Sequence, residues 1–397
     1  MSDMSFLERL LDGVVVKWKS LGEIGEFVRG SGLQKSDFTD SGIGCIHYGQ
    51  IYTYYGDYAY QTKSFVSSTL ATKLRKAQKN DLIIATTSEN IEDVCKTLVW
   101  LGEEEVCVSG ETYIFKHNQN PKYLAYYLKT PNFFDFKKLN RTGTKVIRVH
   151  GDRLATFQIP IPPLAIQAEI VRILDTFTEL TAELTAELTA ELTARQKQYE
   201  YYRDRLLTFE EGEVEWKPLG NLAIIGTGSR NTNEAVLEGK YPFFVRSQEP
   251  RAINEYEFDE TAIITAGDGV GVGNVFHFVS EKYALHQRAY RIVVTTSDVM
   301  PKFLFHFVRF NFSRYLATIS VHASVTSLRK PMFEKYPVPV PSLAEQARIV
   351  STLDKFDTLT TSIREGLPRE IALRQQQYEY YRDLLLNFPK AEEGASN

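Results

Sequence analysis

Apolar side chains recur every three or four residues from position 164 onward, and this spacing predicts a long amphipathic helix. The positions are Leu164, Ile166, Ile170, Ile173, Leu174, Phe177, Leu180 and Leu184. Prolines in the preceding IPIPPL stretch bar a helix before residue 164, and no breaker follows until residue 209. About 45 helical residues would span on the order of 65 Å, and a helix of this length needs a partner packed along it.

The helical pattern occurs twice in the chain. IPIPPLAIQAEIVRILDTFTELT (159–181) returns as VPVPSLAEQARIVSTLDKFDTLT (338–360), and RQKQYEYYRDRLLTF returns as RQQQYEYYRDLLLNF (374–388). Of 51 positions aligned without a gap, 27 are identical. We therefore expect the first long helix to pack on its own copy at 343–388, in which Pro368 should kink or break the helix.

Two modules with little sequence in common accompany these repeats. VKWKSLG (16–22) and VEWKPLG (214–220) mark their beginnings, and PKYLAYYL and PKFLFHFV mark a helix near their ends. Short β-branched and aromatic runs bounded by turn residues predict strands inside them. These runs are 81–88, 105–110, 112–115, 261–269, 274–279 and 289–294. We interpret the chain as a tandem duplication whose helices stayed alike while the modules diverged, rather than as two copies of one domain doing one job.

The predicted fold class is α/β (α+β), with two mixed modules separated by long helices. The expected parts are an N-terminal segment (1–17), a first module (18–155), a central helical region (156–213), a second module (214–335) and a C-terminal helical region (336–397).

Composition narrows the class of protein. Hydrophobic residues make up 43% and charged residues 24% of the chain, as in ordinary globular proteins. Cysteine occurs only at Cys45, Cys95 and Cys107, without CxxC spacing, so neither a disulfide scaffold nor a structural zinc site is expected. No apolar run is long enough to span a membrane, and the first residues do not resemble a signal peptide. We expect a cytoplasmic protein.

Known catalytic motifs are absent from the sequence. There is no GxxxxGK[ST] loop, and the glycine-rich run 267–273 precedes another predicted strand rather than a phosphate-binding helix. Asn120-Pro121 has only one of the two prolines of the NPP-aromatic loop in enzymes that methylate exocyclic amines. The seven histidines show no metal-ligand spacing. We expect this chain to have no catalytic residue, metal or cofactor of its own.

Local basic charge contrasts with the overall net charge of −4. The stretches 63–79, 137–153 and 302–335 each carry a net charge of +5. DNA phosphates bind such charges on polar loops, and Arg, Lys, Asn and Gln read bases, although a solvated basic face is the alternative. The candidate DNA-binding residues are Tyr48, Gln50, Lys73, Arg75, Lys76, Arg141, Lys145, Arg148, Arg246, Gln248, Gln287, Arg288, Arg329 and Lys330.

The duplicated IPIPPLAIQAEIV and VPVPSLAEQARIV segments, the two RQxQYEYYRD helices and the TAEL tract together resemble the specificity subunits of type I restriction–modification enzymes. The resemblance covers essentially the whole chain. It implies two target-recognition domains separated by long helices that pair as an antiparallel coiled coil with pseudo-twofold symmetry. Each domain would read one half of a bipartite, asymmetric site in double-stranded DNA.

The resemblance also implies partners. Two modification (methyltransferase) subunits would dock on the helices, and restriction subunits would complete the complex. S-adenosylmethionine, ATP and magnesium would belong to these partner subunits.

The TAEL tract at 181–192 is a low-complexity segment with leucine at every fourth position. Thr181 opens it, and Leu184, Leu188 and Leu192 form a stripe that suits a coiled-coil seam. Our further hypothesis is that the tract acts as a ruler. Each TAEL unit adds about 6 Å of helix, which would change the unspecified DNA spacer by one base pair or two.

Two other hypotheses stay open. The chain could carry an unrecognised DNA-cleaving or DNA-modifying site, since Asp135-Phe136-Lys137 resembles a nuclease DxK, although no upstream Pro-Asp partner accompanies it. It could also be a purely architectural coiled-coil protein, which would leave the paired basic modules unexplained.

Overall fold

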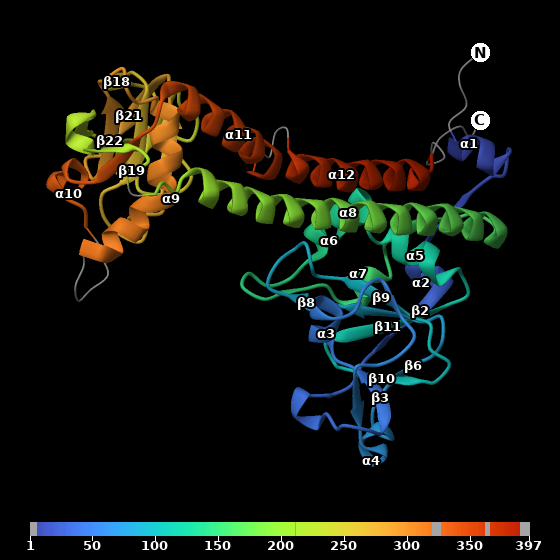
Figure 1. Cartoon of the computed structure of the whole chain (residues 1–397). Coiled ribbons are helices and arrows are strands. Elements are labelled where there is room, and N and C mark those ends of the chain that lie inside the picture. The colour runs from blue at the N-terminus through green and yellow to red at the C-terminus, as the bar shows by residue number, and fades with distance from the viewer. Residues whose placement is uncertain (1–5, 211, 320–326, 362–365, 390–397) are drawn as a thin grey trace. The chain divides into compact units, whose positions relative to one another are not determined.

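The computed structural model describes residues 6–210, 212–319, 327–361 and 366–389. The chain forms two compact units (Figure 1). Unit 1 comprises Met1–Thr185 and Leu373–Asn397, and unit 2 comprises Ala186–Ala372. Each unit holds one of the two sequence-divergent modules together with parts of the long helices. Within the described residues, no helix combines the length and apolar character needed to cross a membrane.

A five-stranded sheet forms the centre of the unit 1 module. Its strand order is β2 (Gly25–Arg29), β11 (Thr112–His117), β7 (Leu82–Ala85), β9 (Lys96–Trp100) and β4 (Tyr58–Ala59). All neighbours are antiparallel except β4 and β9. All four residues of β7 are buried, as expected for a short apolar run bounded by polar residues.

A second sheet completes the β-structure of this module. Its order is β5 (Ser64–Val66), β3 (Ile43–Ile46), β10 (Val106–Val108) and β6 (Lys76–Ala77), and β3 runs parallel to β10. The remaining elements are β8 (Thr87–Ser88) paired with β12 (Ile147–Arg148), α2 (Leu21–Ile24), η1 (Lys35–Asp37), α3 (Tyr48–Thr53), α4 (Ser68–Ala71), α5 (Pro121–Tyr127), α6 (Pro131–Asn140) and α7 (Gly151–Leu154).

Unit 2 repeats this topology, except that its first sheet, within the described residues, has four strands and no counterpart of the edge strand β4. One sheet has the order β15 (Ala223–Thr227), β22 (Ala289–Val294), β19 (Ala262–Ala266) and β20 (Phe276–Val279), all antiparallel. The other has the order β17 (Arg251–Ile253), β16 (Tyr241–Phe244), β21 (Lys282–Leu285) and β18 (Phe258–Asp259), with β16 parallel to β21. Short helices η2 (Leu219–Asn221), η3 (Thr232–Glu234) and α10 (Lys330–Glu334) and the longer α9 (Pro301–Ile319) accompany them.

The six predicted strand segments are confirmed in both units. Modules with little sequence in common therefore share the order of eight strands in two sheets, whereas unit 1 adds the edge strand β4 and the β8–β12 pair. The two modules also differ in the side chains that the shared strands and turns carry.

The repeated sequence motifs close each module by pairing with one another. β1 (Lys17–Ser20) runs antiparallel to β13 (Gln158–Ile161), which places Trp18 opposite Pro160. β14 (Glu215–Pro218) pairs in the same way with β23 (Pro337–Val340), which places Trp216 opposite Pro339. Each of these sheets has only two strands, so every strand has an unpaired edge. Proline is tolerated in such strands because it has no backbone N–H to donate to a neighbour.

The long helices pack antiparallel within each unit. In unit 1, the first part of α8 (Leu164–Leu206) contacts α12 (Leu367–Leu386), where Phe177 stacks on Tyr381 with ring centroids 5.7 Å apart. In unit 2, the last part of α8 contacts α11 (Leu343–Thr361), where Tyr202 stacks on Phe356 at 5.7 Å. The predicted pairing of the long helix with its own copy is confirmed.

The second long helix is two helices. α11 ends at Thr361, and α12 begins at Leu367 with Pro368 in its first turn. Proline is tolerated there because the first backbone N–H groups of a helix have no partner within it. The predicted disturbance at Pro368 thus falls at the beginning of α12, and residues 362–365 before it lie outside the described part of the chain.

The N-terminal helix α1 (Phe6–Leu11) belongs to the same hydrophobic core as the end of α12. Leu7 and Leu11 are buried in one cluster with Leu385 and Leu386.

Candidate nucleic-acid interface

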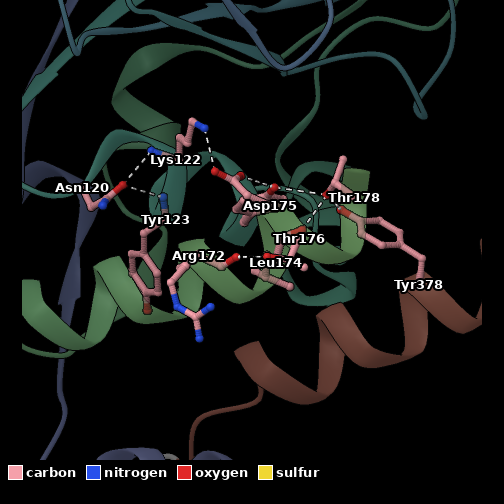
Figure 2. A network of polar contacts seen from close by, with 10 residues as sticks. Asn120, Lys122, Tyr123, Arg172, Leu174, Asp175, Thr176, Thr178 and Tyr378 are labelled. Atoms are coloured by element: carbon pink, nitrogen blue, oxygen red, sulfur yellow. Dashed lines mark hydrogen bonds and ion pairs between the residues drawn. The ribbon is translucent and has the colours of Figure 1, made fainter. Parts of the chain in front are cut away.

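Each module is fixed to a long helix by a polar network centred on an aspartate. In unit 1, Lys122 Nζ lies 2.7 Å from the Asp175 carboxylate (Figure 2). The Tyr126 hydroxyl donates to the same carboxylate at 2.7 Å. Thr178 is 3.2 Å from the Tyr126 hydroxyl and donates to Tyr378 of α12 at 3.1 Å (Figure 2). The network thus ties α5, α8 and α12 together.

Unit 2 has the same arrangement with different chemistry. Lys302 Nζ lies 3.7 Å and His306 Nε2 2.7 Å from the Asp354 carboxylate. Arg309 Nη1 lies 3.0 Å from Asp357 one turn further along α11. His306 is buried, and this burial lowers its pKa, so the ring is neutral at pH 7 and donates its Nε2 hydrogen to the carboxylate.

His306, Asp354 and Asp357 place their ligand atoms within 4.8 Å of one another, close enough to hold a metal ion. Lys302 and Arg309 already bind the two carboxylates, so the negative charge that a metal would require is compensated. The cluster therefore serves as an anchor between α9 and α11.

A fully buried glutamine joins each module to the start of its helix. The Gln167 side chain accepts the Asn120 N–H at 3.0 Å and donates to the Pro162 carbonyl at 2.8 Å. Gln346 makes the same two contacts in unit 2, accepting from Met300 N and donating to the Pro341 carbonyl, both at 2.8 Å. The repeated LAxQA motif therefore encodes a joint that positions the module.

The two modules can be compared position by position through their hydrogen bonds. In unit 1, Ser109 N donates to Ile46 O at 3.2 Å, and Thr86 N donates to Glu111 O at 3.1 Å. In unit 2, His286 N donates to Phe244 O and Gly267 N donates to Arg288 O, both at 2.9 Å. Tyr48 therefore corresponds to Arg246, Thr87 to Asp268 and Glu111 to Arg288.

In unit 2 these positions form an Arg–Asp–Arg triad. Arg246 Nη1 donates to Asp268 Oδ1 at 2.7 Å, and Arg288 Nη1 donates to Asp268 Oδ2 at 3.0 Å. Burial alone would raise the pKa of Asp268, but the hydrogen bonds from both arginines hold it below its ordinary value. The triad carries a net charge of +1 and leaves both guanidinium groups exposed.

In unit 1 the same turn has a different composition. Glu111 accepts a hydrogen bond from the Thr87 hydroxyl and pairs with Arg148, whose Nε lies 3.6 Å from Glu111 Oε2. Tyr48 donates its backbone N–H to the Ser109 hydroxyl at 2.8 Å, beside this turn. Tyr48 and Arg148, about 100 residues apart in sequence, thus each contact a residue of the 109–111 turn.

An exposed basic hairpin extends from the unit 1 module. Thr142 and Arg148 exchange backbone hydrogen bonds of 2.8 and 2.9 Å, and Gly143 at the turn has a φ of +84°. A side chain other than glycine would be strained there, and the Val146 carbonyl would lie 2.1 Å from its Cβ. Arg141 and Lys145 are exposed on this hairpin.

Some of the predicted DNA-binding residues already have partners within the protein. Gln50 is buried, with its amide accepting His47 N at 2.9 Å and donating to the Ser64 hydroxyl at 2.7 Å. Lys76 lies 3.4 Å from Glu105, which offsets part of the 63–79 charge. The others, Lys73, Arg75, Gln248, Gln287, Arg329 and Lys330, are exposed.

The charged side chains of the nuclease-like Asp135-Phe136-Lys137 sequence do not converge on one site. Lys137 is buried, and its Nζ donates to the carbonyls of Glu92 at 2.7 Å and Val94 at 2.9 Å, whereas Asp135 is exposed. Glycine-rich 267–273 joins two strands, as predicted, and so does not begin a phosphate-binding helix.

The basic stretches of the sequence did not indicate the acidic residues Asp268 and Glu111, because a carboxylate lowers the positive charge by which those stretches stand out. A signal existed in the GDG sequence at 267–269, where an acid lies between glycines directly after a buried strand.

Two modules of one topology, each joined to long paired helices and each presenting its own polar side chains at the same turn, define a DNA specificity protein. A family model described as the type I restriction modification DNA specificity domain matches residues 15–194 and 211–373, and the chain belongs to this family. It is a specificity subunit, the non-catalytic component of a type I restriction enzyme complex.

Known proteins are similar over nearly the whole chain. The specificity subunit of the Escherichia coli type I restriction enzyme EcoR124I/EcoR124II is 35% identical over 427 residues, covering 99% of each chain. The crystal structure of the HsdS subunit from Thermoanaerobacter tengcongensis shares the fold with a TM-score of 0.55 at 14% identity, covering 95% of this chain and 98% of that one. A chain from a type I restriction–modification system, studied for complex assembly and conformational transition, gives a TM-score of 0.61 at 16% identity, covering 94% and 97%.

Proposed function

We propose that each module reads one half of a bipartite, asymmetric site in double-stranded DNA. The observation that carries this proposal is the shared strand order of two modules whose equivalent turns differ in charge: Tyr48, Thr87 and Glu111 in unit 1 replace Arg246, Asp268 and Arg288 in unit 2. Bases differ in the hydrogen-bond donors and acceptors on their edges, so different side chains select different bases. Two modules with the same strand order but different side chains therefore suit two different half-sites.

The modules correspond to residues 18–155 and 214–335, and the helical regions to 156–213 and 336–397, with 1–17 as an N-terminal segment. Phosphate contacts come from the exposed basic side chains, above all those of the 142–148 hairpin, and fix each module on the duplex. Base contacts come from Tyr48, Arg148, Arg246, Gln287 and Arg288 beside the equivalent turns.

The helices dock two modification subunits. The RQxQYEYYRD motif exposes the same aromatic side chain in both units, with Tyr201 58% and Tyr380 64% exposed. Large exposed aromatic rings are typical of protein interaction surfaces, and a surface present twice suits two copies of one partner. In this cytoplasmic complex the modification subunits use S-adenosylmethionine to methylate adenine, and restriction subunits use ATP and magnesium.

The helices also set the spacing between the half-sites. Leu184, Leu188 and Leu192 are half-buried while Glu183 and Glu187 are exposed, so the TAEL tract has one packed stripe and one solvated face. α8 runs through the whole tract without interruption. A continuous helix transmits a change of length as a defined shift and rotation.

Module exchange tests the half-site assignment. Residues 214–335 are replaced by the corresponding module of a relative with a known target, and the chimera is expressed with the modification subunits. Sequencing of adenine methylation in the host genome should show one half-site changed and the other retained. If both half-sites change together, the modules do not read independently and the proposal fails.

A further inference from the structure

We propose that Asp268 is a positioning residue that presents Arg246 and Arg288 as a paired reader of guanine in the half-site of unit 2. The inference rests on the proposed function, because it assigns a chemistry to one of the two modules. Neither the sequence motifs nor the family assignment singles out this carboxylate.

Asp268 joins two arginines, and the three residues come from separate parts of the fold. Arg246 follows β16, Asp268 follows β19, and Arg288 lies in the turn between β21 and β22. Each arginine donates through Nη1 to a different oxygen of the same carboxylate. Without the carboxylate, two guanidinium groups this close together would repel each other and sample many rotamers.

The contact leaves a recognition edge free on each arginine. A guanidinium group has five N–H donors in a planar fork, and Nη1 supplies the bond to Asp268. In the described part of the chain, neither arginine has a second hydrogen-bond partner for its side chain. Nε and Nη2 lie on the other edge of the fork, with the spacing that matches guanine O6 and N7.

The geometry also limits where the two arginines can act. Both bind one carboxylate, so their forks lie within a few ångströms of each other, whereas successive base pairs are about 3.4 Å apart. The pair therefore reads one base pair or two adjacent ones. Since both side chains carry donors only, the bases they select must offer acceptors, and guanine offers two in the major groove.

The equivalent turn of unit 1 has no Arg–Asp–Arg triad. Thr87 occupies the position of Asp268, and Glu111 occupies that of Arg288. Glu111 pairs with Arg148, whereas the nearby Arg29 donates to the Gly110 carbonyl at 3.0 Å, so the carboxylate at this turn does not join two arginines by hydrogen bonds. The guanine pair is thus a property of the unit 2 half-site alone.

Asp268→Asn separates positioning from a simple charge effect. The substitution keeps the side-chain shape but removes one negative charge from a DNA-binding face, which by itself should leave binding to any DNA unchanged or tighter. Loss of positioning should instead weaken recognition of particular base pairs. The two explanations therefore predict opposite changes for cognate DNA.

The experiment uses the full chain assembled with its modification subunits and a duplex library with randomised positions. The wild-type complex should select a bipartite motif with one or two neighbouring G·C pairs in one half-site. Asp268→Asn should lower the preference at those pairs about 5- to 150-fold, without weaker binding to a duplex of unrelated sequence and without change in the other half-site. Asp268→Glu, which keeps the charge, should restore part of the preference.

Asp259→Asn is the matched control. Asp259 is an exposed acid in the same module, paired at 3.9 Å with Lys282 at the opposite end of β21 from the His286–Arg288 turn. The Asp259→Asn substitution removes the same charge as Asp268→Asn and should leave the selected DNA motif as in wild type. Thermal unfolding near the wild-type temperature establishes that both variants are folded.

The inference is overturned if Asp268→Asn selects the wild-type motif with the same preference, or if binding to cognate and unrelated duplexes falls by the same factor. It is also overturned if neither wild-type half-site contains a G·C pair. A wild-type complex that selects no bipartite motif overturns the proposed function as well, so the two failures are distinguishable.

Discussion

Tyr126 and His306 hold matching places in the two units, and each makes a 2.7 Å hydrogen bond to an aspartate of a long helix. Tyr126 is neutral over the whole physiological range, because burial and its aspartate partner raise its pKa further above the ordinary value of 10. His306 can take up a proton as the pH falls, with a pKa that burial holds below its ordinary value of 6.5. Protonation of His306 therefore makes the contact between module and helix sensitive to acid in unit 2, whereas Tyr126 has no such effect in unit 1.

Acidification should weaken the α9–α11 joint through His306. Burial holds the folded-state pKa of His306 below its ordinary value of 6.5, with Lys302 acting in the same direction and Asp354 and Asp357 opposing it. The unfolded state therefore binds more protons between these two pKa values, and stability present above pH 6.5 is lost as the pH falls through the folded pKa.

The measurement is hydrogen exchange of α9 amides at pH 7 and pH 5, corrected for the intrinsic rate. His306→Tyr should reduce the loss of protection at the lower pH, and the reciprocal Tyr126→His should introduce such a loss in α5. Other histidines with lowered pKa, including His117 at about 4, affect wild type and variants alike. Equal pH dependence of α9 protection in wild type and His306→Tyr would remove His306 from this role.

Lys145 should contribute to binding without contributing to sequence preference. Its side chain is exposed on the 142–148 hairpin, where phosphate contacts are expected. Lys145→Ala should weaken binding to cognate and unrelated duplexes similarly and reduce the slope of log affinity against log salt by about one. Titrations at several salt concentrations measure this slope. A changed motif with an unchanged slope would instead make Lys145 a base reader.

Tyr201 and Tyr380 should each support one modification subunit. Placing a lysine at either position puts a charge into the proposed contact, and burying an unpaired charge is costly. Native mass spectrometry should show one modification subunit per chain for Tyr201→Lys or Tyr380→Lys, and two for wild type. Tyr60→Lys, at a 61% exposed tyrosine in the unit 1 module, is the control. If both Tyr201→Lys and Tyr380→Lys still bind two modification subunits, the docking surface lies elsewhere.

The helices were predictable because their signal is local. The apolar spacing after Leu164 and the repeated motifs specify α8, α11 and α12 without knowledge of the rest of the fold. The first long helix ends at Leu206, three residues before the predicted end at Phe209. The shared topology of the modules could not be predicted, because β3 and β10 pair across about 60 residues and little sequence similarity marks their equivalents β16 and β21.

The candidate site was predictable only in part for the same reason. Arg246 and Arg288 carry the right chemistry in sequence, but Asp268 acquires its role only when three strand ends meet. Gln50 shows the converse. Its residue type suits base reading, yet a local contact with His47 N and a contact with Ser64 engage its amide inside the module.

The most direct test of the whole account is deletion of one TAEL unit, Thr185 to Leu188. Four residues shorten a helix by about 6 Å and rotate it by a net of about 40°, while one base pair of B-DNA advances about 3.4 Å and turns about 34–36°. Removing only two residues rotates the helix by about 200° and should abolish joint binding.

Methylation sequencing of a host genome carrying the four-residue deletion and the modification subunits gives the result. The account predicts both half-sites unchanged, with the unspecified spacer shorter by one base pair or two. Methylation that stays at the original spacing and at no shorter one would show that the helix does not set the distance between two independently reading modules.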